Sequence, residues 1–166
     1  MRAHGADRLK AMVFVDLSPR PLSTQEGDWV EGPLGDIAGA YTAFLTSSQG
    51  QRDFVTGYAT DVMVQRELAP EELAWIVGES LHTPYYIAAA YFAAGMFSDY
   101  LEEAKKIDET LPALSICAEH WAETATAFMN KHCPNTKTAV LGGHMMFWEH
   151  SEKFNAIVDE FLAGVK

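Results

Sequence analysis

The sequence predicts an α/β protein in which parallel strands are flanked by helices, with a long helical insertion after the first strand. Three observations lead to this fold class. Residues 9–17 form an apolar run, which is typical of a strand buried on both faces of a parallel sheet. Residues 36–106 carry a helical pattern, and strands and helices alternate again from residue 107 to residue 166.

The first strand is expected over residues 10–17, because the Ser-Pro-Arg-Pro stretch at 18–21 stops it. The helices of the insertion are indicated by their first turns. Residues 70–72 read Pro-Glu-Glu, and both proline and acidic side chains are favoured at a helix N-terminus. Thr-Pro at 83–84 and Ser-Asp at 98–99 open two further helices. The expected helices are 51–68, one from 70 onward, 84–97 and 100–106.

The C-terminal part predicts strands over 113–118 and 136–141, with a helix over 123–132 between them. This alternation indicates right-handed crossovers and three parallel neighbouring strands. A final helix follows, and its apolar positions form one stripe at helical spacing. The stripe comprises Phe154, Ile157, Val158, Phe161, Leu162 and Val165.

Composition narrows the functional classes. A chain of 166 residues with 48% hydrophobic content can form one globular domain with a real core. A net charge of −11 argues against a nucleic-acid partner, because no basic surface is available to neutralise phosphates. No apolar run approaches the roughly 18 residues of a membrane span, so we expect a cytoplasmic protein without a membrane partner. Neither the thiols nor the histidines have a metal-site spacing, and no cofactor is expected.

The most informative motif follows the last expected strand. Gly143-His144 comes after a second glycine, precedes the final helix, and is followed by Glu149 and then by Phe154-Asn155. This arrangement resembles the C-terminal half of the α/β-hydrolase superfamily, in particular its haloperoxidase-like and esterase-like members. In that family the catalytic histidine lies on the loop after the last strand. The resemblance therefore implies that His144 is a general base.

A second stretch carries the same resemblance. Residues 15–22 read Val-Asp-Leu-Ser-Pro-Arg-Pro-Leu, a phrase similar to the one that follows strand six in these hydrolases. The resemblance implies a partial α/β-hydrolase fold, with residues 1–22 and 107–166 as the hydrolase core. Residues 23–106 would then be the helical cap or lid, and residues 1–9 the end of the helix after the nucleophile.

The acid that orients a catalytic histidine has three candidates. We rank Asp16 first, at the end of the first strand, where sites of open α/β sheets form. Glu119 and Glu123, near the end of the second strand, rank second and third. Other roles remain open from the residues alone. His144 could cap the last helix or pack under Trp148, and Asp16 could cap the Ser-Pro turn.

A nucleophile is the missing component. The sequence contains no Gly-x-Ser-x-Gly elbow, which requires a strand, a sharp turn and a helix. Ser80 has the nearest surroundings, Gly78-Glu79-Ser80-Leu81-His82, but lacks the second glycine and follows a helical stretch.

The substrate pocket is expected to be apolar. Trp121, Tyr86 and Phe147 are the predicted pocket residues, although ordinary packing of the insertion against the core is the simpler explanation for the aromatic residues of the insertion. A small apolar substrate with an ester, lactone, amide or carbon–halogen bond would fit the family.

Two classes of function compete. In the first, the chain is the truncated C-terminal portion of an esterase- or lactonase-like hydrolase of the Ser-His-acid type, and the N-terminal half comes from another polypeptide. In the second, the chain is a non-catalytic remnant or a ligand-binding or interaction protein of the same fold. In either case an open edge on the first strand predicts association, with the missing half or with a second copy.

Overall fold

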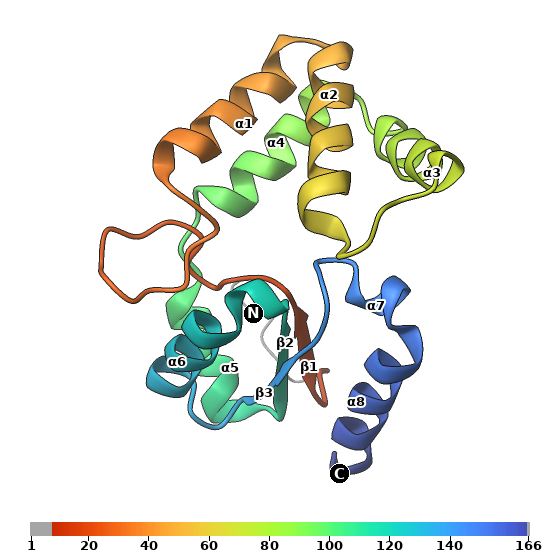
Figure 1. Cartoon of the computed structure of the whole chain (residues 1–166). Coiled ribbons are helices and arrows are strands. Elements are labelled where there is room, and N and C mark those ends of the chain that lie inside the picture. The colour runs from red at the N-terminus through yellow and green to blue at the C-terminus, as the bar shows by residue number, and fades with distance from the viewer. Residues whose placement is uncertain (1–7, 166) are drawn as a thin grey trace.

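The computed structural model describes residues 8–165, and residues 43–46 are described without their side chains. Its centre is a three-stranded parallel sheet in the order β1-β2-β3 (Figure 1). The strands are β1 (Met12–Val15), β2 (Ala113–Cys117) and β3 (Lys137–Val140). The prediction of three parallel neighbouring strands is therefore confirmed. The expected helix end at residues 1–9 lies, up to residue 7, outside the described residues.

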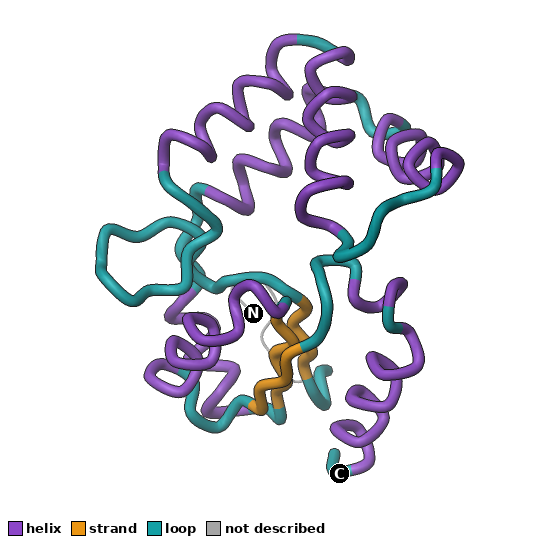
Figure 2. The backbone as a smooth tube through the Cα atoms, in the orientation of Figure 1, coloured by secondary structure: helices purple, strands orange, loops and turns teal. Residues whose placement is uncertain are grey.

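The helices account for most of the remaining chain (Figure 2). A π-helical turn, η1, extends α2, and a 3₁₀ turn, η2, leads into α6. The bounds are α1 (Leu34–Thr46), α2 (Ser48–Tyr58), η1 (Ala59–Met63), α3 (Pro70–Leu81), α4 (Tyr85–Met96), α5 (Leu101–Thr110), η2 (Glu119–Trp121), α6 (Ala122–His132), α7 (Met146–Glu149) and α8 (Ser151–Ala163).

The helices form three groups around the sheet. Figure 1 shows α5 and α6 on one side of the sheet and α8 on the other, while α1 to α4 gather beyond one end. The loop that leaves β3 runs toward the group formed by α1 to α4. There the backbone N–H of Met145 donates to the carbonyl of Met63, 2.7 Å away. The helical segment 34–96 therefore contacts the loop that follows the last strand.

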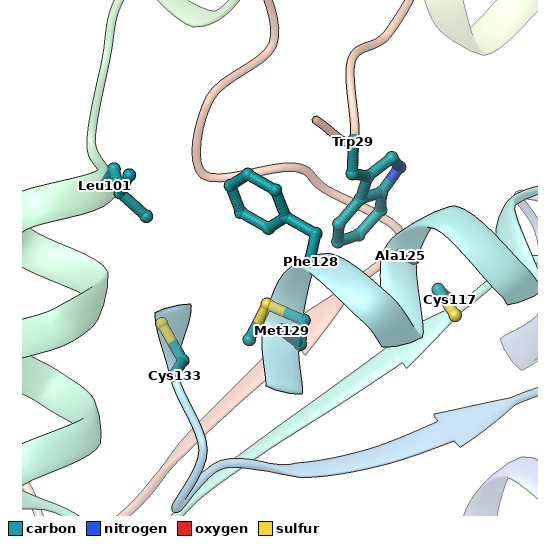
Figure 3. Close-up of a cluster of buried hydrophobic side chains, with 7 residues drawn as sticks. All are labelled: Trp29, Leu101, Cys117, Ala125, Phe128, Met129 and Cys133. Atoms are coloured by element: carbon teal, nitrogen blue, oxygen red, sulfur yellow. The ribbon is translucent and has the colours of Figure 1, made fainter. Parts of the chain in front are cut away.

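Alternate residues of the sheet supply two hydrophobic clusters, as the period of a strand requires. Leu114 and Ile116 pack toward α8 with Phe161. On the opposite side, Cys117 joins a cluster with Phe128 of α6. Figure 3 shows this second cluster, whose members are Trp29, Leu101, Cys117, Ala125, Phe128, Met129 and Cys133.

The second cluster includes two residues of the segment expected to form the cap. Trp29 and Leu101 fall within the segment 23–106, yet both are buried against the sheet side of the molecule. The helices that lie apart from the sheet occupy residues 34–96. Large apolar side chains on both flanks of the 34–96 segment therefore help to cover this face of the sheet.

The first strand is less buried than its sequence predicts. All four residues of β1 are half-buried, whereas all five residues of β2 are buried. Two features of the described residues explain this. Only β2 pairs with β1 within residues 8–165, so one edge of β1 is unpaired. In addition, Met12 and Phe14 line an open cavity of about 470 Å³ beside α5.

The expected helix over 51–68 ends early. The π-helical turn closes it at Met63, and Val64 is extended, with φ −128° and ψ 158°. Tertiary packing overrides the local helical pattern here, because the backbone of Gly143 lies directly against Met63 and Val64. The remaining helices begin within a few residues of the predicted positions.

One buried carboxylate joins a helix to the last strand. Asp108, at the C-terminal part of α5, accepts hydrogen bonds from the N–H and the hydroxyl of Thr136, at 2.6 and 2.7 Å, and from Asn135 at 3.1 Å. It therefore fixes the start of β3 against α5. Among the described residues, no helix is both long enough and apolar enough to cross a membrane.

Candidate active site

The loop after β3 presents His144. Gly142 has φ +51°, a conformation that side chains with a Cβ disfavour, and its carbonyl accepts the N–H of Glu119 at 2.9 Å. Gly143 follows with no room for a side chain, since a Cβ there would lie 3.0 Å from the carbonyl oxygen of Met63. The two glycines therefore let the chain turn sharply after β3, where it passes between the residues that follow β2 and the helical segment. His144 lies at this turn.

Asp16 lies at the carboxyl end of β1, facing His144. Its side chain is only 2% exposed, and its backbone adopts φ +47°, a conformation that aspartate tolerates better than most residues. One carboxylate oxygen accepts the N–H of Ala118 at 2.8 Å. The other lies 2.9 Å from Nδ1 of His144. The carboxylate is thus held between the end of β2 and the imidazole.

This contact determines the chemistry of the imidazole. An ionised carboxylate only accepts hydrogen bonds, so Nδ1 of His144 must carry the proton, which leaves Nε2 as a free acceptor in the neutral ring. Among residues 8–165, Nε2 has no hydrogen-bonded partner, and the His144 side chain is 36% exposed. The ring can therefore accept a proton from a group that approaches from outside these residues.

Tyr58 closes another side of the imidazole. Its ring packs edge-on against that of His144, with 5.8 Å between centroids. Burial, together with the charges of Glu31 and Asp16, raises the pKa of the Tyr58 hydroxyl to about 12. Tyr58 therefore stays neutral. It belongs to the helical segment, whereas His144 lies on the loop that follows the last strand of the sheet.

A second carboxylate lies near the pair. Glu31 is half-buried and accepts the N–H of Ser18 at 3.0 Å. Its pKa is raised, mainly by burial and further by the charge of Asp16, while His144 lowers it. Sequence reasoning missed both Glu31 and Tyr58, because neither lies in a recognisable motif and both reach the site through the fold.

The other two acid candidates lie elsewhere. Glu119 is exposed and accepts a hydrogen bond from Nε2 of Gln65 at 3.1 Å. Glu123 is exposed in the first turn of α6. The structure thus brings Asp16 together with His144, and it directs Glu119 to another partner. The catalytic roles of these residues remain predictions.

The alternative roles considered for the pair do not match the contacts. The residue at the N-terminus of α8 is His150, whose carbonyl accepts the N–H of Phe154. Trp148 packs with Trp75, at 5.8 Å between ring centroids, and beneath the guanidinium of Arg66. His144 therefore neither caps the last helix nor packs under Trp148.

Asp16 is likewise not the cap of the Ser-Pro turn. The N–H of Ser18 donates to Glu31, and the N–H of Arg20 donates to the Ser18 hydroxyl at 3.1 Å. Ser80, the serine nearest to an elbow pattern, lies inside α3 and donates to the carbonyl of Ile76.

The three predicted pocket residues occupy separate places. Trp121 packs against both hydrophobic clusters, Tyr86 is exposed on α4, and Phe147 is exposed on α7 with its ring against Phe154. A cavity of about 920 Å³ lies instead next to the histidine loop. It is lined by η1 and the loop after it, and by Glu119, His120 and Gly143.

Comparison with known proteins identifies the fold. No protein-family model and no curated protein matches the chain. Solved structures do match it, among them the following three. The hydrolase olei00960 from Oleispira antarctica has a TM-score of 0.79 at 17% identity, covering 97% of this chain and 59% of its own. The enol-lactonase from Burkholderia xenovorans LB400 has a TM-score of 0.75 at 20% identity, covering 96% and 58%. MenH from S. aureus has a TM-score of 0.62 at 16% identity, covering 93% and 59%.

These likenesses concern the fold. Nearly the whole chain superimposes on each neighbour, yet it spans less than two thirds of each neighbour's length. The mixed architecture, with a three-stranded parallel sheet flanked by helices, matches part of an α/β-hydrolase structure.

Proposed function

We propose that this chain, which has part of an α/β-hydrolase fold, supplies the histidine and the acid of a Ser-His-acid site that hydrolyses an ester or a related bond. The observation that carries the proposal is the contact between Asp16 and Nδ1 of His144, with Nε2 left open. A base that is oriented by a buried carboxylate and has one free nitrogen is what nucleophile activation requires.

In the proposed mechanism, Nε2 of His144 takes the proton of an attacking hydroxyl as that hydroxyl adds to the substrate carbonyl. Asp16 keeps the proton on Nδ1 and stabilises the imidazolium that results. The same proton then passes from Nε2 to the departing alcohol, and a water molecule repeats the sequence to release the acid. This chain would contribute the base, its orientation and the electrostatic stabilisation.

The nucleophile would come from another segment, in the same polypeptide or in a second one. Within residues 8–165, none of the three strands enters a helix through a Gly-x-Ser-x-Gly turn. The unpaired edge of β1 supports a place for such a segment, because a further parallel strand could continue the sheet there. The 470 Å³ cavity beside Met12 and Phe14 offers an apolar surface on which the helix after that further strand could pack.

The helical segment 34–96 would act as a cap over the substrate. Two of its contacts support this role: Tyr58 packs on the imidazole, and the carbonyl of Met63 accepts the N–H of Met145. The cavity beside Gly143 has room for a small ester or lactone next to the loop that carries His144, although neither His144 nor Asp16 lines it. Because one structural neighbour is an enol-lactonase, lactones belong among the first substrates to test.

The test compares the chain alone with the chain produced together with the polypeptide encoded directly upstream. Both are assayed with a short-chain nitrophenyl ester and a small lactone. The proposal predicts no turnover by the chain alone, because a histidine–acid pair lacks a nucleophile and oxyanion donors. It predicts turnover by the combination.

Two results would contradict the proposal. Turnover by the isolated chain that depends on His144 would reveal a nucleophile within it. A stable combination that binds esters or lactones without hydrolysing them would instead support the alternative, a non-catalytic or ligand-binding protein of the same fold.

A further inference from the structure

We propose that Glu31 is a positioning residue for the pair formed by Asp16 and His144, acting through the turn at Ser18 and through its own negative charge. The proposal rests on the function proposed above. It concerns a residue that no sequence motif marks, and it can be tested on the chain by itself.

The first observation is a clamp on the turn that carries Asp16. Two residues after Asp16, the N–H of Ser18 donates to the Glu31 carboxylate at 3.0 Å. The Ser18 hydroxyl donates to the carbonyl of Trp29 at 2.5 Å and accepts the N–H of Arg20 at 3.1 Å. The loop ending at Glu31 is thus fastened to the turn by side-chain and backbone bonds, with the buried Trp29 as its anchor.

The clamp matters because the turn is strained where it presents the acid. Asp16 has φ +47°, a left-handed conformation that residues with a Cβ adopt less readily than glycine. Such a conformation persists only when surrounding contacts hold it. Glu31 accepts one of the hydrogen bonds that hold the turn, so its loss should loosen the orientation of the Asp16 carboxylate toward His144.

The second observation is electrostatic. The Glu31 carboxylate accepts the N–H of Ser18, and its charge interacts with those of Asp16 and His144. The same negative charge raises the pKa of the Tyr58 hydroxyl. Burial and the charge of Asp16 raise the pKa of Glu31, whereas the charge of His144 lowers it. Once ionised, Glu31 adds a second negative charge that favours the imidazolium formed during proton transfer.

Two substitutions separate the roles of Glu31. Glu31→Gln keeps an oxygen that can accept the Ser18 N–H but removes the charge. Glu31→Ala removes both. Glu119→Gln is the matched control, because Glu119 is a carboxylate near the same loop that accepts a hydrogen bond from Gln65 instead.

The experiment follows two signals by NMR as the pH changes: the side-chain carboxyl carbon of Glu31 and the Nδ1 proton of His144. In the unmodified chain, the Nδ1 proton should shift as Glu31 titrates. Glu31→Gln should abolish that step while retaining the resonance, and Glu31→Ala should make the proton exchange faster by about tenfold, the effect of losing one hydrogen bond of ordinary strength. Glu119→Gln should leave both signals unchanged.

A reciprocal measurement checks the coupling. Asp16→Asn should lower the pKa of Glu31, since it removes the nearby negative charge. His144→Gln should raise it, since it removes the positive charge that the protonated form of the imidazole places near Glu31. A Glu31 titration that is unaffected by both substitutions, or an Nδ1 signal that behaves identically in Glu31→Gln and in the unmodified chain, would overturn the proposal.

These outcomes are distinct from a failure of the proposed function. If the Nδ1 resonance depends on Asp16 but not on Glu31, only the role of Glu31 is wrong. If it does not depend on Asp16 either, the pair on which the hydrolase mechanism rests is itself wrong.

Discussion

Replacing Gly142 by alanine tests the turn that presents His144. Gly142 has φ +51°, and a Cβ at this position would meet the ring of His150, at 2.9 Å from Nε2. The substitution leaves the imidazole of His144 and the carboxylate of Asp16 chemically intact. Its effect therefore reports on the backbone conformation of the turn and on the packing of the His150 ring against it.

The expected loss of stability follows from three contributions. The left-handed conformation costs alanine about 1–2 kcal/mol. Moving the His150 ring away from its rotamer costs about 0.5–1.5 kcal/mol. Alanine gives the unfolded chain less conformational freedom than glycine, and this offsets about 0.4–1 kcal/mol of the loss of stability. We expect Gly142→Ala to lower the free energy of unfolding by about 0.5–3 kcal/mol.

Urea denaturation followed by circular dichroism measures this change, with Gly78→Ala as the matched control. Gly78 lies exposed inside α3, and a Cβ there would meet no atom within 4 Å. The control should therefore gain about 0.5–1 kcal/mol, as alanine does over glycine in a helix. If Gly142→Ala is as stable as the control, the turn before His144 is not the one described.

Three further predictions concern groups away from the turn. Asp108→Ala should lower the free energy of unfolding, measured in urea, by about 2–4 kcal/mol, because it leaves three donors without their buried carboxylate. The control Glu109→Ala, on the exposed side of the same helix, should change this free energy by less than about 0.5 kcal/mol. Equal effects of the two substitutions would contradict the role of Asp108. Hydrogen bonds from Arg66 and from the backbone lower the pKa of Glu72 to about 2, so the contribution of this carboxylate to stability is complete above pH 4.5 and lost as the pH falls through 2. Arg66→Ala should move the titration of the Glu72 carboxyl, followed by carbon NMR, back toward 4.5. A titration that does not move would exclude the ion pair. Burial raises the pKa of the Cys117 thiol to about 11, so alkylation at pH 8 should be slow in the folded protein and fast in urea, and rapid labelling of folded protein would show that the second hydrophobic cluster is open.

The sheet could be predicted from the sequence because its strands, most clearly β1 and β2, are short apolar runs bounded by turn residues. The run ending at Asp16 and the one before Gly142 both end where the structure places the candidate site. The pairing of Asp16 with His144 was expected as the first of three possibilities, since carboxyl ends of parallel strands share one edge. Choosing among the acids required coordinates, because Glu119 is nearer in sequence but points to Gln65.

Other features depend on long-range contacts that leave no local signal. Glu31 lies in a loop without periodicity, and only the bond to Ser18 brings it toward the site. The early end of the helix at Met63 results from packing against Gly143, which lies 80 residues later in the chain. The half-buried state of β1 depends on what pairs with its free edge, and a strand's own residues do not specify that partner.

The most direct test of the central claim is the rate of ester hydrolysis by the chain combined with the nucleophile-bearing segment of the proposed site, measured for three variants. His144→Ala should lower kcat by at least about 10³-fold and Asp16→Asn by a comparable factor, because the base is lost in one and held in the wrong tautomer in the other. His82→Ala, which removes an exposed histidine of the helical segment, should leave the rate unchanged. A His144→Ala combination that hydrolyses the ester as fast as the His82→Ala combination would contradict the assignment of His144 as the general base.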